Sequence, residues 1–265
     1  MKLFTKSLLV LSLFLLTAVS AFAQINLYWV GGSGNWSDHS NHWALSSGGA
    51  VYHNQVPSPL DTVIFDANSF PSGGTVSLNV DAFCSKMVWG GGMSTTPTFS
   101  GSGKVVEVGG DFTLDVPVNW SLSGGSFNVG GDFTYAGANN INMGNMNVEG
   151  DFNMTPSASV NFSYGSLYLA GSLTTQNTNW LGSWIYFDGT TTGHTITSNG
   201  DHFDNVMFQG QGGEWTLTDD FEVDGETQFK WGSFVSDGNN VDFGWRLYAL
   251  FGDADFDMDF TGTDT

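Results

Sequence analysis

The chain has 265 residues, with 6 Lys and Arg against 26 Asp and Glu, which gives a formal net charge of −20 at pH 7. Only 12% of the residues are charged while 15% are aromatic, and this combination excludes a disordered acidic chain. The 36 glycines follow no three-residue period, which excludes collagen. With so few basic residues, the chain cannot form the positive patch of a nucleic-acid-binding protein.

The first 23 residues have the pattern of a secretory signal peptide. Lys2 and Lys6 form a positive start, an apolar run follows from position 8 to 16, and Ala21 and Ala23 make an A-x-A cleavage site. The apolar run is too short to cross a bilayer, so we expect no membrane insertion. The sequence therefore predicts a secreted, extracellular or cell-surface protein.

Cys84 is the single cysteine of the chain, so no intramolecular disulfide can form although export is predicted. It follows Ala82 and Phe83 in an apolar stretch, which favours a buried packing role. We expect the stability of the fold to come from packing and backbone hydrogen bonds.

A repeat of about 20 residues runs through the middle of the chain. Each unit alternates apolar and polar residues, as a strand with one buried face does, and a glycine precedes its second apolar run. Four units begin at positions 106, 127, 146 and 167. This spacing predicts two inward columns of stacked side chains, one of Val108, Val129, Val148 and Leu169 and one of Phe112, Phe133, Phe152 and Leu173.

The period predicts an all-β fold, a parallel β-helix (β-solenoid) with about 20 residues per coil. A helical repeat would need long runs with apolar i, i+3, i+4 spacing, and a propeller blade needs roughly twice this period. We expect about nine coils in residues 75–265. The chain should bend between two faces at the repeated glycines, which are Gly110, Gly131, Gly150 and Gly171.

Residues 24–74 do not follow the repeat and are rich in Trp, Gly and Asn. They are predicted to form an irregular N-terminal cap, because a solenoid has to cover the edge of its first coil. At the other end, positions 253–260 alternate Asp with mostly apolar residues as a strand would, and no cap follows. We therefore expect a solenoid truncated at its C-terminus, with the natural protein continuing into further domains.

Two regions resemble large secreted β-helix surface proteins of Bacteroidota. Residues 29–38, with positions 41–43 and 61–65, resemble the opening of those proteins and of autotransporter adhesin passengers, and residues 213–225 with 232–234 resemble their internal coils. The resemblance implies a right-handed helix, the common form of this fold, and an adhesin-like role at the cell surface. It also implies export by the type IX route, and it names no catalytic residue.

Three aspartates form the candidate metal site of the sequence. Asp111, Asp132 and Asp151 are 21 and 19 residues apart, so stacked coils would place neighbouring carboxylates about 5 Å apart. Each pair would repel by roughly 0.9 kcal/mol in water, and calcium between the coils would relieve the repulsion. The alternative is that each aspartate caps a turn by accepting backbone N–H groups. No other cofactor is expected.

The histidines are not expected to bind metal. His39, His42 and His53 share the N-terminal segment but lack acidic or cysteine partners at zinc spacing. His194 and His202 are expected in polar surface loops.

The sequence disfavours an enzyme. Asp219 and Asp220 are a carboxylate pair that glycoside hydrolysis could use, but adjacent residues on a strand point to opposite faces. Such an acidic chain would also repel polyuronates. Several tryptophans could stack on sugars, although packing is the favoured role, namely for Trp29, Trp36, Trp43, Trp120, Trp215 and Trp231.

The predicted function is that of a non-catalytic structural or adhesin-type β-helix protein, whose partner is an extracellular glycan or a surface protein. The alternative is a glycan-binding or polysaccharide-degrading β-helix. Convergent aromatic or acidic side chains on successive coils would favour the alternative. A smooth surface of Asn, Ser and Thr would favour the structural protein.

Overall fold

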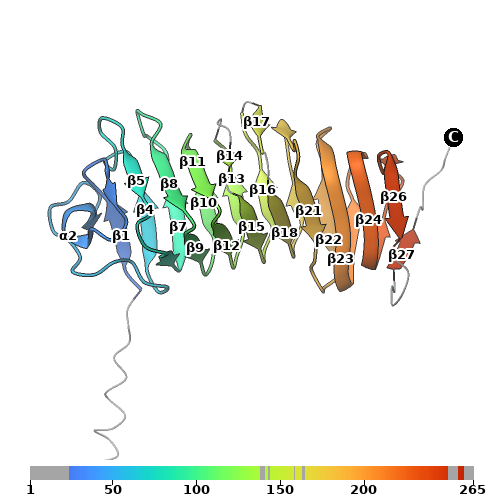
Figure 1. Ribbon diagram of the computed structural model, residues 1–265, viewed down its shortest axis with the longest axis horizontal. Helices are drawn as coiled ribbons and strands as arrows, with labels where there is room; N and C mark the ends of the chain where they lie inside the picture. The colour runs from blue at the N-terminus through green and yellow to red at the C-terminus, as the bar shows by residue number, and fades with distance from the viewer. Residues whose placement is uncertain are drawn as a thin grey trace, which may run out of the picture.

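The computed structural model describes residues 24–137, 141–142, 144–157, 159–162, 165–249 and 256–259. The predicted signal peptide, residues 1–23, lies outside the described residues, as do Asp253 and Asp255 of the predicted C-terminal strand. Strands predominate, and the helix of the described part is α2 (His39–His42). The strands stack side by side into an elongated rod, with the N-terminal segment at one end (Figure 1).

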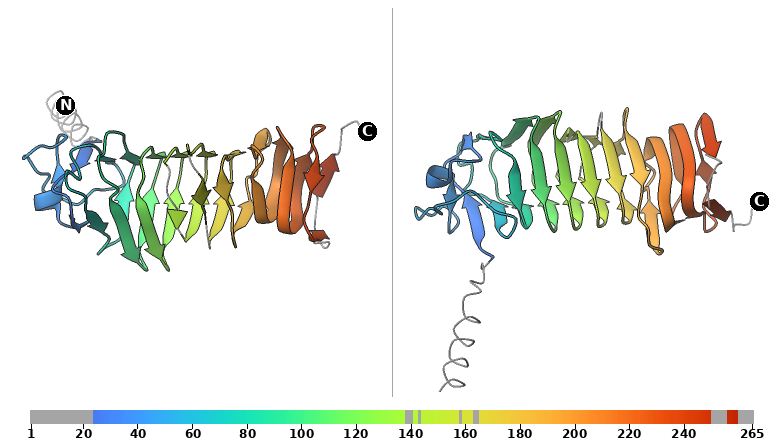
Figure 2. Two further views of the ribbon diagram at one scale, coloured as in Figure 1. Left: turned by 90° about the horizontal axis from the view of Figure 1, so that it is seen from above. Right: turned by 60° about the horizontal axis from the view of Figure 1, so that its bottom comes forward.

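The rod is a β-solenoid of about 8 turns with about 21 residues per turn, which confirms the predicted fold class and period. Within a turn, the chain passes along a first, a second and a third face before it returns to the first (Figure 2). Each face consists of parallel strands that pair with equivalent strands of neighbouring turns, continuously along the first and second faces and in separate groups along the third.

The first face continues in parallel register from residue 82 to residue 249. It contains the middle parts of β23 (His202–Leu217) and β24 (Phe221–Val235). Its other strands are β6 (Ala82–Cys84), β9 (Val105–Val108), β12 (Ser126–Val129), β15 (Asn145–Val148), β18 (Ser166–Leu169), β21 (Trp184–Phe187) and β26 (Arg246–Ala249).

The second face begins inside residues 24–74 and contains the last parts of β23 and β24. Its other strands are β1 (Asn26–Trp29), β4 (Thr62–Phe65), β7 (Lys86–Trp89), β10 (Phe112–Leu114), β13 (Phe133–Tyr135), β16 (Phe152–Met154), β19 (Leu173–Thr174), β22 (His194–Thr197) and β27 (Phe256–Asp259).

The third face consists of shorter, separate groups. The beginnings of β23 and β24 form the last group with β25 (Val241–Asp242). The earlier groups are β2 (Gly34–Asn35), β5 (Thr75–Ser77), β8 (Thr98–Ser102), β11 (Asn119–Ser123) and β14 (Ile141–Asn142), followed by β17 (Val160–Asn161) and β20 (Thr178–Asn179).

Both predicted inward columns are confirmed. Val129 lies between Val108 and Val148 in register, and Phe133 lies between Phe112 and Phe152. The rings of Phe133 and Phe152 stack with centroids 4.6 Å apart and an angle of 7° between their planes. All members of both columns are buried. Because a strand exposes alternate residues to opposite sides, burying these columns leaves the intervening polar residues on the surface.

The second glycine of the repeat is required by the close approach of neighbouring turns. A Cβ on Gly131 would lie 2.8 Å from the carbonyl carbon of Gly110, a distance that side chains do not tolerate. The backbones of successive turns therefore touch at this corner, which explains why glycine recurs there.

The N-terminal segment covers the open edge of the second face. The strand β3 (Trp43–Ala44) pairs antiparallel with β1 and so occupies the edge to which another chain could add. Trp43 packs edge-to-face against Trp29 and Trp36, with centroids 5.0 and 4.8 Å away. These rings are fully buried and close the apolar core at this end of the rod.

Candidate functional site

The three predicted aspartates form one column at the corner between the first and second faces. Each carboxylate reaches toward the next turn: Oδ1 of Asp111 accepts the N–H of Asp132 at 3.3 Å, and Oδ1 of Asp132 accepts the N–H of Asp151 at 2.9 Å. Oδ1 of Asp151 then accepts the N–H of Ser172 at 2.8 Å. The column thus ties four successive turns together through side chain to backbone hydrogen bonds.

This geometry is that of the turn-capping alternative. The ammonium of Lys86 donates to Oδ2 of Asp111 at 3.0 Å, and this hydrogen bond holds the pKa of Asp111 below its usual value. One oxygen of each aspartate is already an acceptor for a backbone N–H, and in the described chain the three carboxylates do not form a close group of ligand atoms. The calcium site at Asp111, Asp132 and Asp151 stays a prediction.

Asp219 and Asp220 cap different turns. The carboxylate of Asp219 accepts the backbone N–H groups of Ser198 and Asn199 on the preceding turn, at 2.8 and 2.5 Å. The carboxylate of Asp220 accepts the N–H of Asn240 on the following turn, at 2.8 Å. The two acids therefore bind backbone groups on opposite sides along the rod.

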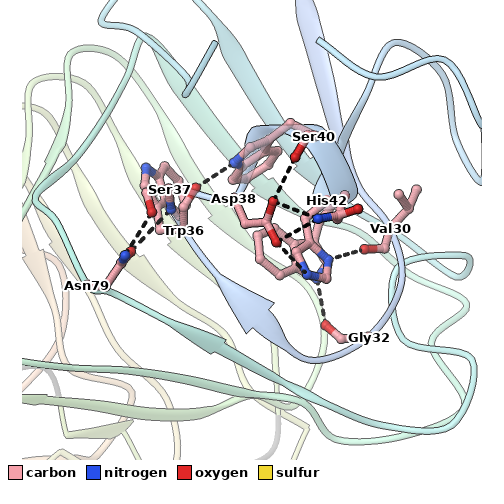
Figure 3. Close-up of polar contacts among 11 residues, drawn as sticks. Val30, Gly32, Trp36, Ser37, Asp38, Ser40, His42 and Asn79 are labelled. Atoms are coloured by element: carbon pink, nitrogen blue, oxygen red, sulfur yellow. Dashed lines mark hydrogen bonds and ion pairs between the residues drawn. The ribbon is translucent and has the colours of Figure 1, made fainter. Parts of the chain in front are cut away.

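The polar side chains of the N-terminal segment surround His42 and hold its ring in the packed interior (Figure 3). The His42 ring is buried and stacks on Trp29 with centroids 4.5 Å apart, and its Nδ1–H donates to the carbonyl of Val30 at 2.7 Å. Asp38 lies 4.0 Å from Nε2 of His42 and binds the side chains of Ser40 and Asn41. Any side chain at Gly34 would overlap the ring.

Most of the suspected tryptophans pack inside the rod, as expected. Trp29, Trp36, Trp43 and Trp215 are fully buried, and Trp120 is nearly so, with its ring stacked on Phe99 at 4.4 Å. Trp231 is only partly buried, and the ammonium of Lys230 lies 3.9 Å from its ring centroid. None of the five buried rings is available to stack on a sugar.

The outward column of the second face is polar over several turns. Its members are in register and carry hydroxyl or amide groups, namely Thr113, Thr134, Asn153, Thr174 and Thr197. The hydroxyl of Thr197 shares a 2.6 Å hydrogen bond with that of Thr218 on the next turn. From Thr113 to Thr197, this column therefore presents Thr and Asn side chains outward.

The first face carries an aromatic strip, defined as Tyr168, Trp184 and Tyr186. The rings of Tyr168 and Tyr186 stack across neighbouring turns with centroids 4.6 Å apart and 9° between their planes. Trp184 lies beside Tyr186 on β21, at 5.7 Å and 19°. All three side chains are partly exposed, and burial followed by the neighbouring Tyr168 raises the pKa of Tyr186. The alternation of the sequence predicts that these residues point outward. Their contact across turns could be found only from the pairing of β18 with β21.

A group that the sequence reasoning missed lies at the start of the long strands. Among the residues that the structure describes, one group of three side chains could supply ligands to a metal ion. It consists of His202, Glu222 and Asp224, whose possible ligand atoms lie within 4.8 Å of one another. The prediction of loops is wrong for His194 and His202, because His194 opens β22 and His202 opens β23, whereas the predicted surface position is correct for the exposed His202. The available signal was the 20-residue separation of His202 and Glu222, which equals about one period.

The ladders and their inward columns define a β-solenoid protein. The chain matches no family model, no curated protein and no solved structure. No helix in the described ranges has the length and apolar character needed to cross a membrane. The surface of the rod is therefore the basis for inferring a function.

Proposed function

We propose that the protein is a secreted or cell-surface rod of structural or adhesin type, without catalytic activity. The observation that carries this proposal is the parallel register, which runs from β1 to β27 and gives about 8 stacked turns. A turn in such an array contacts mainly its neighbours, so length and surface can vary while the core stays the same. That property suits a protein that holds a binding surface away from a cell.

The acidic side chains of the rod support the non-catalytic part of the proposal. Asp111, Asp132, Asp151, Asp219 and Asp220 each accept backbone N–H groups and so serve as caps between turns. A glycoside hydrolase needs two carboxylates that converge on one bond. These five carboxylates are distributed along the rod instead.

Export and the partner class rest on the sequence. The pattern of residues 1–23 and the likeness to surface β-helix proteins of Bacteroidota support an extracellular location with a glycan or a surface protein as the partner. The low content of Lys and Arg argues against nucleic acid.

The test combines localisation with loss of one turn. Residues 105–125 form one complete turn, since Val105 lies opposite Ser126 in the ladder, so their deletion joins equivalent positions. We expect the chain and the deletion variant to reach the medium or the cell surface, to show the same β-type circular dichroism and to release no reducing sugar from polysaccharides. Retention inside the cell would contradict the proposal. Hydrolysis of a polysaccharide by the unchanged chain that is lost in Asp219→Asn or Asp220→Asn would also contradict the proposal.

The aromatic strip favours glycan binding as a second candidate function. Three partly exposed rings on two neighbouring turns offer apolar surface beside the polar side chain of Asn147, and sugars stack on such rings. The strongly acidic chain favours a neutral glycan over an anionic one.

A glycan array tests this candidate with a matched pair of tryptophan variants. Trp184→Ala removes a ring of the strip, whereas Trp245→Ala removes an exposed ring near the last turn. We expect Trp184→Ala to lose most of the glycan signal and Trp245→Ala to keep it. Equal signals from both variants would exclude the strip as the binding surface.

A further inference from the structure

His202, Glu222 and Asp224 are held together by the ladder itself. His202 opens β23, and it lies directly opposite Glu222 on β24 in the next turn. Asp224 follows two residues later on β24, so its side chain emerges on the same side as that of Glu222. All three side chains are exposed. Their relative positions are set by two paired backbones, which is the rigid support that a binding site needs.

The imidazole of His202 is bracketed by two carboxylates. Its Nε2 lies 3.2 Å from Oε2 of Glu222, and its Nδ1 lies 3.3 Å from Oδ1 of Asp224. Two ligands of a tetrahedral zinc ion, each about 2.0–2.2 Å from the metal, are separated by roughly 3.3–3.5 Å. The distance between Nε2 and Oε2 is close to this value, so a small ion could bind both atoms with little movement.

Asp224 has the position of an orienting group. A metal-bound histidine usually donates its other ring N–H to a carboxylate, which fixes the tautomer and raises the basicity of the ligand nitrogen. Oδ1 of Asp224 faces Nδ1 in that way, and this leaves the lone pair of Nε2 directed at Glu222. A protonated imidazole would donate one N–H to each carboxylate, so zinc binding is the property that distinguishes a metal site from an ion-paired histidine.

The surrounding charge favours a cation. Asp242 lies opposite Glu222 on the following turn and adds a second carboxylate to the column of His202 and Glu222. The nearest cations along the chain have other partners, since the Lys230 ammonium lies 3.9 Å from the Trp231 ring centroid and Arg246 lies 3.9 Å from Glu226. The formal charge of −20 raises the concentration of cations at the surface of the whole chain.

We propose that His202, Glu222 and Asp224 form a surface site for one divalent transition metal of the zinc class. Nε2 of His202 and a carboxylate oxygen of Glu222 bind the ion, Asp224 orients the imidazole, and water completes the coordination. An imidazole ligand selects zinc and its neighbours over calcium and magnesium, which prefer oxygen. The inference does not depend on whether the rod is adhesive.

Zinc alone is the probe, and isothermal titration of the purified chain is the measurement. We expect one equivalent of zinc to bind per chain, without competition from millimolar calcium. His202→Ala should lower the zinc affinity by at least about 100-fold and Asp224→Asn by about 10- to 100-fold. The control His53→Asn, which removes a half-buried histidine of the N-terminal segment, should bind as the unchanged chain does.

Circular dichroism of each variant verifies that the fold is retained, which is expected because the three side chains are exposed. Cobalt titration gives a second readout, since a d–d absorption band should appear with the unchanged chain and be absent with His202→Ala. The proposal is overturned if the chain binds no zinc, if His202→Ala keeps its affinity within twofold, or if His53→Asn loses as much affinity as His202→Ala.

Discussion

Cys84 shows how burial controls the chemistry of one residue. The thiol lies in the inward column of the first face, opposite Val108, and has 1% of its surface exposed. Burial, together with the nearby negative charge of Asp61, raises its pKa to about 12. A thiolate is the reactive form of cysteine, so the native chain should contain almost none.

We therefore expect native Cys84 to be inert toward thiol reagents at pH 8 and to react fully once guanidinium unfolds the chain. Absorbance after addition of a chromogenic disulfide reagent measures both states. The unfolded chain is the internal control, and rapid labelling of the native chain would show that the first face opens easily.

Asp188, which follows β21, carries an unfavourable charge in the folded chain. Burial, and then the neighbouring Glu149, raises its pKa from 3.8 to about 6. Because the folded-state pKa is the higher one, the folded chain holds a proton that the unfolded chain has lost between these values. Its contribution to stability is full below pH 3.8 and is lost as the pH rises through about 6.

Asp188→Asn removes this charge and should raise the melting temperature at pH 7, with little change at pH 4. Thermal melts at the two pH values measure the difference, and Asp115→Asn is the control at an exposed carboxylate. An equal gain at both pH values would contradict the assignment to ionisation.

Single residues were predicted unevenly from the sequence. Burial of Trp29 and Cys84 followed from their apolar surroundings, and the capping role of Asp132 was foreseen as an alternative. The trio around His202 was missed because its members lie on two turns, and their contact requires the register of β23 with β24. A histidine flanked by polar residues resembles a loop when the neighbouring turn is not known.

At the scale of the strand, hydrogen bonds from backbone N–H groups to Asp111, Asp132 and Asp151 link neighbouring turns at the corner, where no strand pairing does so. The corner between the first and second faces has no regular strand, so the N–H groups there need other acceptors, and the aspartates provide them. Each carboxylate sits one turn before the N–H that it binds, so the column also helps to set the register.

Asp132→Ala should lower the free energy of unfolding by about 1 kcal/mol, because the N–H of Asp151 loses its acceptor. Asp132→Asn keeps an acceptor oxygen and should cost less. Urea denaturation compares these variants with Asp115→Ala, which removes an exposed carboxylate between β10 and β11. An equally large decrease in the free energy of unfolding of Asp115→Ala would indicate a general effect of charge rather than loss of a cap.

The elements themselves were predictable where their residues repeat. The Gly-Asp-Phe pattern predicted β10, β13 and β16 together with their register. The third face was not predicted, because its inward residues change from turn to turn, as Phe99 and Trp120 do. Different side chains fill the core at equivalent positions of the third face, so the sequence of this face shows no regular repeat.

For the whole molecule, the dominant long-range term is repulsion among acidic groups. The chain has a formal charge of −20 and a pI of about 4.1, and its few cations cannot neutralise the surface. Compact acidic chains are destabilised by this repulsion, and salt screens it. The screening length falls from about 30 Å at 0.01 M salt to about 8 Å at 0.15 M.

Raising sodium chloride from 0.01 to 0.15 M should therefore raise the melting temperature at pH 7. The same increase at pH 4, close to the pI, should have little effect and is the control. Differential scanning calorimetry measures both. A melting temperature that falls with salt at pH 7 would mean that attractive ion pairs outweigh the repulsion.

The direction of the ladders has a mechanical consequence. The hydrogen bonds between turns point along the rod, so a pull on its two ends loads the bonds of the outermost turn first. Each released turn of about 21 residues frees roughly 70 Å of chain, about fifteen times the 4.8 Å that it occupied in the stack. Under tension the molecule would lengthen in discrete steps while its remaining turns stayed folded.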